Sequence, residues 1–260
     1  MIKRIVGVVT IMNDWAVQSV GYETYRPLGR PEIIAQNLDR WQLEEILICD
    51  ISRSRNGLGP NIRLLETIAN KRISTPLTYI GGIRNESDAI KVIKSGADRI
   101  GIESLIDTNP DAVNKISSAI GAQALVIAQS VINNGNGLKK FNFIERTTSK
   151  FNIDKLLNTM SYASELLLID VNNEGKKNSF NKKILKPFQE SDIQIICFGG
   201  ISASAQISDL LNNKNVSAVG IGNFLNHAEL ANWNLVKNSK HKSTRQLSYG
   251  KLTQGAKEWF

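Results

Sequence analysis

The sequence predicts a single closed barrel of eight parallel β-strands, each followed by a helix: an α/β protein with the (β/α)8 TIM-barrel architecture. Eight short runs of β-branched and aliphatic residues alternate with amphipathic helical patterns along the 260 residues. Most of the runs are continuously apolar, which is typical of parallel strands covered by helices. Eight strand–helix units in about 250 residues fit a closed barrel better than an open doubly wound sheet.

The elements follow from local sequence signals. Pro31 stands where a first helical residue is expected, Asn85 can cap a helix that carries acidic residues in its first turn, and Gly96 can end that helix. The asparagines and glycines of residues 134–140 indicate a hairpin after the fifth strand. The expected strands are 4–11, 45–51, 76–80, 99–102, 124–128, 165–171, 194–198 and 218–221, and the expected helices are 31–43, 85–95, 109–120, 154–163, 181–188 and 202–211.

An internal repeat divides the barrel into two similar halves. EILICD at 45–50 matches ELLLID at 165–170, IGGI at 80–83 matches FGGI at 198–201, and IGI at 100–102 matches VGI at 219–221. The three matches share nearly one offset, which is close to half the chain and too long for a solenoid. We therefore expect a duplicated half-barrel whose site could hold a molecule with two similar ends.

The strand ends supply candidate anion sites. In (β/α)8 barrels the functional site lies at the carboxyl ends of the strands. Gly81-Gly82 and Gly199-Gly200 each follow a strand and precede a helix, where backbone N–H groups can approach a phosphate. Their counterparts one unit later are Glu103-Ser104 and Gly222-Asn223. A glycine pair also occurs in any tight turn, so the duplication carries the argument for two phosphate sites.

Other strand-end residues are candidates for chemistry. Asp50 and Asp170 are symmetry mates that end apolar strands, where a carboxylate is either catalytic or an acceptor for loop N–H groups. Thr10 and Gln129 end the first and fifth strands. No zinc, Walker or Ser/His/Asp pattern is present, so we expect no metal and no cofactor. Cys49 and Cys197 lie in apolar runs and are expected in the core.

Composition excludes several classes of protein and locates the excess charge. With 42% hydrophobic and 22% charged residues, the chain is neither collagen-like nor disordered. No apolar run reaches the about 18 residues of a membrane helix, and the first residues do not resemble a signal peptide, so we expect a cytoplasmic protein. The formal net charge is +8, and residues 237–257 hold six basic and no acidic residues. We expect the barrel over residues 1–230 and a basic extension over 231–260, either a solvated tail or a docking segment for an acidic partner.

Three segments resemble one known family. LEEILICDI at 43–51, PLTYIGGIR at 76–84 and GADRIGIES at 96–104 resemble HisF, the cyclase subunit of imidazole glycerol phosphate synthase, and the resemblance runs from Arg4 to about Leu225. It implies a duplicated (β/α)8 barrel that forms a heterodimer with a HisH-type glutaminase. The glutaminase releases ammonia at the bottom of the barrel, and the ammonia travels to a substrate with a phosphate at each end.

The resemblance implies a charged gate at the barrel bottom. The family positions on strands one, two, four and six are here Arg4, Glu45, Arg99 and Glu165. Two acids and two bases at matching depth can close a ring of ion pairs, although an ordinary surface ring would use the same residues. Asp98 matches a family position that contacts the glutaminase.

The catalytic face departs from the family. The two catalytic aspartates of the family are matched in this chain by Thr10 and Gln129, whose side chains do not ionise near neutral pH. Asp14 falls in the loop after the first strand. At one phosphate site the usual Asn-Thr pair is Glu103-Ser104, and this carboxylate would repel a phosphate. The candidate phosphate ligands are Gly82, Ser104, Gly175, Gly200, Gly222 and Asn223, of which the last four remain fully compatible with the family pattern.

These departures lead to three hypotheses. The first is a HisF-like subunit that receives ammonia from a HisH-like glutaminase and supports nitrogen incorporation, onto a sugar in surface-polysaccharide biosynthesis, with a sugar amidotransferase as a possible further partner. The second is a functional imidazole glycerol phosphate synthase cyclase. The third is a non-catalytic basic scaffold. The expected ligand is a phosphorylated or sugar small molecule, and we expect neither a membrane nor a specific nucleic acid as partner.

Overall fold

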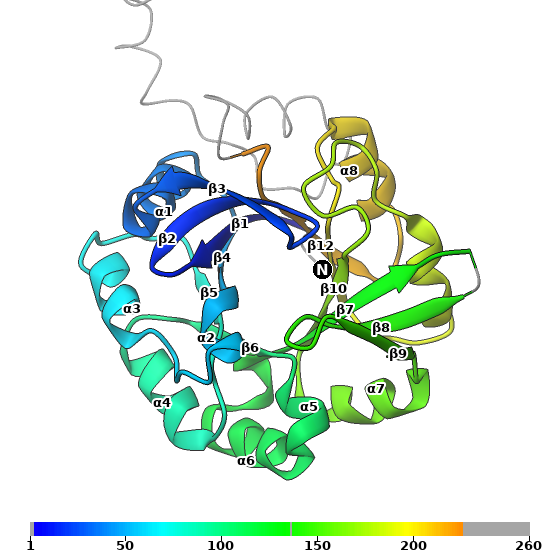
Figure 1. Cartoon of the computed structure of the whole chain (residues 1–260), viewed down its shortest axis with the longest axis horizontal. Helices are drawn as coiled ribbons and strands as arrows, with labels where there is room; N and C mark the ends of the chain where they lie inside the picture. The colour runs from blue at the N-terminus through cyan, green and yellow to red at the C-terminus, as the bar shows by residue number, and fades with distance from the viewer. Residues whose placement is uncertain (1–2, 136, 226–260) are drawn as a thin grey trace, which may run out of the picture.

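The structure is a closed barrel of eight parallel strands surrounded by helices (Figure 1). It is a computed structural model, and it describes residues 3–135 and 137–225. Each strand pairs in parallel with the next, and β12 closes the circle on β1. The barrel strands are β1 (Arg4–Met12), β4 (Glu45–Asp50), β5 (Leu77–Ile80), β6 (Arg99–Ile102), β7 (Leu125–Asn133), β10 (Glu165–Asp170), β11 (Ile195–Phe198) and β12 (Val216–Ile221). The predicted fold class and all eight predicted strands are confirmed.

The helices cover the outside of the barrel. The α-helices are α1 (Pro31–Arg40), α2 (Ile51–Arg55), α3 (Ile62–Ala69), α4 (Glu86–Lys94), α5 (Leu105–Thr108), α6 (Pro110–Ile120), α7 (Ile153–Thr159) and α8 (Ser204–Leu211), and the 3₁₀ helices are η1 (Ala122–Ala124), η2 (Met160–Tyr162) and η3 (Lys182–Phe188). Asn85 caps α4 as expected, because its side chain accepts a hydrogen bond from Asp88 N. Residues 181–188, expected as a helix, form the 3₁₀ helix η3, whose Pro187 has no N–H for an α-helical bond.

Two hairpins extend across the carboxyl end of the barrel (Figure 1). The predicted hairpin after the fifth strand is confirmed: β7 pairs antiparallel with β8 (Leu138–Asn142), and β8 pairs antiparallel with β9 (Thr147–Lys150). The other hairpin was not predicted: in it, β2 (Trp15–Val20) pairs with β1 and with β3 (Thr24–Gly29). Its first turn is Asn13-Asp14, and both residues have positive φ, a combination that favours a tight hairpin turn.

Alternate residues of the strands build two apolar layers. One layer fills the barrel and includes Val8, Leu47 and Leu167, together with Tyr22 and Phe141 from the two hairpins. The other lies between the strands and the helices. Cys49 and Cys197 are free, buried thiols. Among the described residues, no helix is both long and apolar enough to cross a membrane, and no three metal-ligating side chains form a candidate metal site.

Glu174 attaches the β2–β3 hairpin to the segment that follows β10. This carboxylate is only 2% exposed, and it accepts hydrogen bonds from Ser19 Oγ at 2.9 Å and from Tyr22 N at 3.2 Å. The carbonyl of Glu174 accepts another from Gly21 N at 3.0 Å. The hairpin therefore lies over the barrel because a buried acid on the opposite half of the barrel holds its tip.

We predict that Glu174→Ala releases the hairpin while the barrel stays folded. The substitution leaves Ser19 Oγ and Tyr22 N without their acceptor, so the free energy of unfolding should fall by about 2 kcal/mol. Hydrogen exchange should accelerate over residues 15–29. Glu145→Ala, at an exposed acid of the other hairpin, is the control and should change neither measurement. Unchanged exchange in the Glu174 variant would contradict this role.

Candidate functional site

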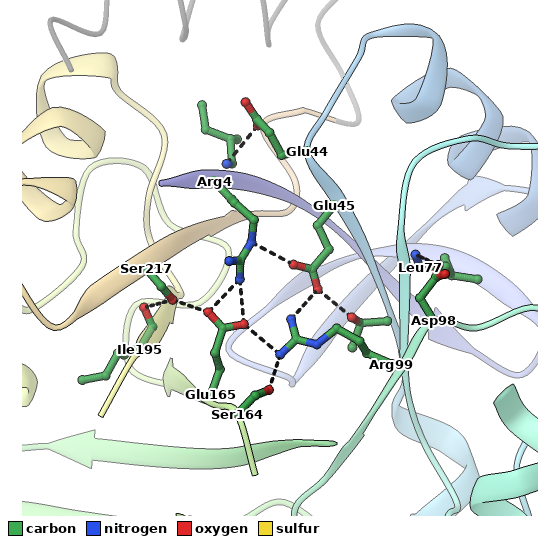
Figure 2. Close-up of polar contacts among 12 residues, drawn as sticks. Arg4, Glu44, Glu45, Leu77, Asp98, Arg99, Ser164, Glu165, Ile195 and Ser217 are labelled. Carbon is green, nitrogen blue, oxygen red and sulfur yellow. Dashed lines mark hydrogen bonds and ion pairs between the residues drawn. The ribbon is translucent and has the colours of Figure 1, made fainter. Parts of the chain in front are cut away.

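Four charged side chains form a closed ring inside the amino-terminal end of the barrel (Figure 2). Arg4 Nε lies 3.2 Å from Glu45 Oε2, and Arg4 Nη2 lies 2.7 Å from Glu165 Oε2. Arg99 closes the circle, since its Nη1 lies 3.4 Å from Glu45 Oε1 and its Nη2 lies 2.8 Å from Glu165 Oε2. The structure thus brings together all four residues expected at this end. We call them the ion-pair ring.

Neutral side chains satisfy the remaining atoms of the ring. Thr78 Oγ1 donates to Glu45 Oε1 at 2.6 Å, Ser217 Oγ donates to Glu165 Oε1, and Arg99 Nη2 donates to Ser164 Oγ at 2.8 Å. Arg99 Nε is the exception: it is buried and has no hydrogen-bond partner among the described residues. Arg99 is therefore held through the end of its guanidinium group alone.

The ring favours the charged forms of Arg4 and Glu165. Burial alone would raise the pKa of Glu165, but the Arg4 and Arg99 guanidinium groups and the Ser217 hydroxyl outweigh burial and lower it. Burial alone would lower the pKa of Arg4, but Glu165 and Glu45 raise it. Glu45 and Glu165 are 3% and 6% exposed, so water screens their charges little. The two carboxylates depend on the Arg4 and Arg99 guanidinium groups for neutralisation.

Asp98 lies beside the ring on the same end of the barrel (Figure 2). The residue is exposed, and its Oδ2 accepts a hydrogen bond from Leu77 N at 2.8 Å. Asp98 N in turn donates to Leu77 O at 2.8 Å. This reciprocal pair fixes the start of β6 against β5 and leaves the face of Asp98 open to a partner.

At the opposite end of the barrel, Thr10 and Gln129, the residues expected at the family's catalytic positions, do not face the same space. Thr10 lies at the carboxyl end of β1 and lines a pocket, as expected. Gln129 instead shares the strand face of Ile127 and Val131, which pack towards the helices, and its Nε2 donates to Ser130 O at 3.1 Å. Ser130 lines the pocket at this strand end. The placement of Gln129 at the barrel mouth was therefore wrong by one residue, although Ser130 is no carboxylate either.

Asp50 and Asp170 act as acceptors for their own loops. Ser52 Oγ donates to Asp50 Oδ1 at 2.8 Å, while Asn173 Nδ2 and Asn181 N donate to Asp170 Oδ2 at 2.7 and 2.8 Å. The two aspartates are 2% and 1% exposed. Burial raises the pKa of both, against these hydrogen bonds. The sequence left two interpretations of these aspartates, catalysis or the anchoring of loops. This geometry supports the anchoring of loops.

Four of the six predicted phosphate ligands line one pocket in the second half of the barrel, which we call the Gly200 pocket. It has a volume of about 270 Å³. The Asn223 side chain is already engaged by the β2–β3 hairpin, because its Oδ1 accepts a hydrogen bond from Ser19 N at 3.2 Å and its Nδ2 donates to Ser19 O at 2.6 Å. Two exposed lysines that sequence reasoning missed complete the pocket. Its lining includes Thr10, Gln18, Gly175, Lys176, Lys177, Gly200, Gly222 and Asn223.

The first-half site lacks this set of donors. Gly82 N donates to Ser54 Oγ at 3.2 Å, so that N–H is already used. Gly82 has φ +69°, and a Cβ there would lie 2.6 Å from Leu58 O, so the turn itself requires glycine. Gly82 and Ser104 line a pocket with Glu103, which we call the Glu103 pocket. Gly82 therefore fits the tight-turn reading better than a phosphate ligand.

Breaking the ion-pair ring should cost far more stability than breaking a surface pair. Arg99→Met leaves two buried carboxylates with one guanidinium group, and we expect the free energy of unfolding to fall by about 3 kcal/mol. Lys182→Met removes the exposed pair with Asp209 and should cost less than about 1 kcal/mol. Urea unfolding measures both. Equal, small losses would show that the ring is an ordinary surface network.

The contribution of Glu165 should depend on pH in one direction. The folded protein lowers the pKa of Glu165 below its ordinary value of 4.5, so Glu165 stabilises the fold above that value, and the stabilisation is lost as pH falls through the folded pKa. The difference in free energy of unfolding between the native chain and Glu165→Gln should therefore be constant near pH 7 and shrink below about pH 4.5. A difference that grows on acidification would contradict an ionised ring.

Comparisons with known proteins agree with this geometry. The profile of the histidine biosynthesis protein family matches residues 4–231. The chain is similar to subunits named imidazole glycerol phosphate synthase subunit HisF. The one from Thermococcus gammatolerans is 29% identical over 76% of this chain and 79% of its own length. Those from Dictyoglomus thermophilum and Natranaerobius thermophilus are 28% and 27% identical, over 76% and 81% of this chain and 80% and 83% of their own lengths. The barrel, matched over nearly all of its described length, belongs to the histidine biosynthesis protein family.

Proposed function

We propose that this chain is the synthase-side subunit of a glutamine amidotransferase pair. It receives ammonia at the amino-terminal end of the barrel and delivers it to a phosphorylated acceptor at the other end. The closed ion-pair ring carries this proposal. A ring of four complementary charges inside a barrel is expensive to bury and contributes little net stability, so its completeness favours a role as a gate.

The interior above the ring suits neutral ammonia. The lumen is lined by apolar side chains, among them Val6, Val8, Leu167 and Ile196. An ammonium ion would lose its hydration there and find no counter-charge, which is costly in free energy. Neutral ammonia would leave water at a much smaller cost in free energy. Arg99 is the member best placed to swing aside, because only its terminal nitrogens are bound and Arg99 Nη1 lies 3.4 Å from Glu45.

The proposed partner is a HisH-type glutaminase. The similar proteins are named as subunits of a synthase, so a second subunit is expected for this chain too. Asp98, exposed beside the ring, is the proposed contact. Docking at this end would place the source of ammonia directly against the gate.

The acceptor we propose is a sugar with its phosphate in the Gly200 pocket. Thr10 and Ser130 stand at the strand ends that face the pockets, and neither provides a carboxylate acid or base. The absence of both acids should cost a cyclase about 10²–10⁴-fold in rate for each group. The second candidate is cyclisation to imidazole glycerol phosphate, which the names of the similar proteins favour.

The first test is stimulation of a glutaminase. Mixed with a HisH-like glutaminase, the chain should form a complex and raise glutamate release from glutamine. Asp98→Lys should weaken the complex about tenfold, because it reverses a charge at the proposed contact. Lys182→Met is the control and should bind normally. Neither a complex nor stimulation would overturn the proposal.

Complementation separates the two acceptors. In a histidine auxotroph that lacks its cyclase, the chain together with its HisH-like partner should fail to restore growth without histidine, because both acid–base groups are missing. Restored growth would establish the cyclase reaction. Expression in the same cells is verified by immunoblot, and a functional HisF serves as the positive control.

A further inference from the structure

The two halves of the barrel mouth, although related by duplication, offer different chemistry. Gly222-Asn223 follows β12, and its symmetry mate Glu103-Ser104 follows β6. The Gly200 pocket is lined by four glycines and two lysines, whereas the Glu103 pocket is lined by the Glu103 carboxylate, with Arg55 at its exposed rim. A molecule that reaches both pockets meets a positive end and a negative end.

Glu103 forms no ion pair with a Lys or Arg among the described residues: Lys140, whose charge favours the ionised form of Glu103, is paired with Asp107 instead. The hydrogen bonding of Glu103 comes from Ser130, whose N–H lies 2.6 Å from Glu103 Oε1 and whose hydroxyl also bonds the carboxylate. The carboxylate is partly buried and lines the pocket. Burial raises its pKa, against the hydrogen bonds from Ser130 and the charge of Lys140. Carboxylates in such surroundings are normally paired, so a cation bound in the pocket next to Glu103 would be stabilised.

The walls of the Glu103 pocket are largely apolar. Ile80 and Ile169 come from barrel strands, and Tyr22 and Phe143 come from the two hairpins. The Cys49 thiol also lines the pocket, and burial raises its pKa so that it stays protonated. These walls suit an apolar body, and the aromatic side chains can also face a cation.

The hairpins enclose this pocket through contacts with each other. Arg146, in the β8–β9 turn, donates to Tyr22 O at 2.8 Å and to Glu23 Oε1 at 2.6 Å. Arg55 Nη2 donates to Phe143 O at 3.3 Å at the exposed rim, where water screens its charge. A ligand under the hairpins is thus shielded from solvent, which strengthens its interaction with Glu103.

We propose that the Glu103 pocket binds a protonated amine carried on an apolar group, so that a molecule spanning both pockets has a single phosphate end. The amine would donate to the oxygen of Glu103 that Ser130 N does not occupy. A phosphate in this pocket would lie against the Glu103 carboxylate and is disfavoured. The identity of this molecule as the ammonia acceptor rests on the proposed function, but its binding does not.

The experiment measures binding to the full chain alone, without a glutaminase. The probes are benzylammonium, benzyl alcohol and benzoate, which share an apolar body and differ in charge, together with inorganic phosphate. Isothermal titration and saturation-transfer NMR measure affinity and stoichiometry. Glu103→Gln tests the pocket, and Glu145→Gln, at an exposed acid of the β8–β9 hairpin, is the matched control.

The native chain should bind benzylammonium about tenfold more tightly than benzyl alcohol, because the interaction with a carboxylate is charge-assisted, and should bind benzoate most weakly. Glu103→Gln should remove the preference for benzylammonium while benzyl alcohol binding persists, which shows that the pocket is intact. Phosphate should occupy one site and be unaffected by Glu103→Gln. Benzoate affinity equal to that of benzylammonium, or a second phosphate site of equal affinity, would overturn the proposal. Loss of phosphate binding alone would count against the proposed acceptor site instead.

Discussion

The ion-pair ring is the constraint on which the rest of the structure depends. Arg4, Glu45, Arg99 and Glu165 each start a different barrel strand, and every one of them turns into the lumen. Because strand residues alternate between faces, these four fix which residues of each strand face inward. The apolar lumen and the pockets at the far end follow from that register. A ring so costly to desolvate is hard to explain by stability alone.

The opposite end of the barrel shows how duplication allows two sites to diverge. Both halves retain the strand–glycine–helix turn, and in both the glycine is required by its backbone conformation: Gly200, like Gly82, has positive φ, and a Cβ there would lie 2.4 Å from Ser179 Oγ. What differs is the next strand end, where one half has glycine and asparagine and the other has Glu103. One substitution at a symmetric position is thus enough to change the charge that a pocket prefers.

The barrel could be predicted from the sequence because its strands are short apolar runs with clear boundaries. The β2–β3 hairpin could not, since no residue of β3 is buried and the strand has no apolar alternation to identify it; the Asn13-Asp14 pair is the one local signal that could have found the turn. Gln129 was misplaced because β7 is nearly continuously buried, so its sequence does not show which residues face the lumen. The hydrogen bond from Gly82 N to Ser54 Oγ depends on α2 meeting the turn after β5 in space, which no local pattern reveals.

The most direct measurement of the central claim is hydrogen exchange on the chain with and without its HisH-like partner. The account predicts that protection on complex formation is confined to the amino-terminal ends of the barrel strands, around Arg4, Glu45, Asp98 and Glu165. The two hairpins at the other end should exchange as they do in the free chain. Protection centred on the hairpins, with the ring end unchanged, would contradict the claim that ammonia enters through the ion-pair ring.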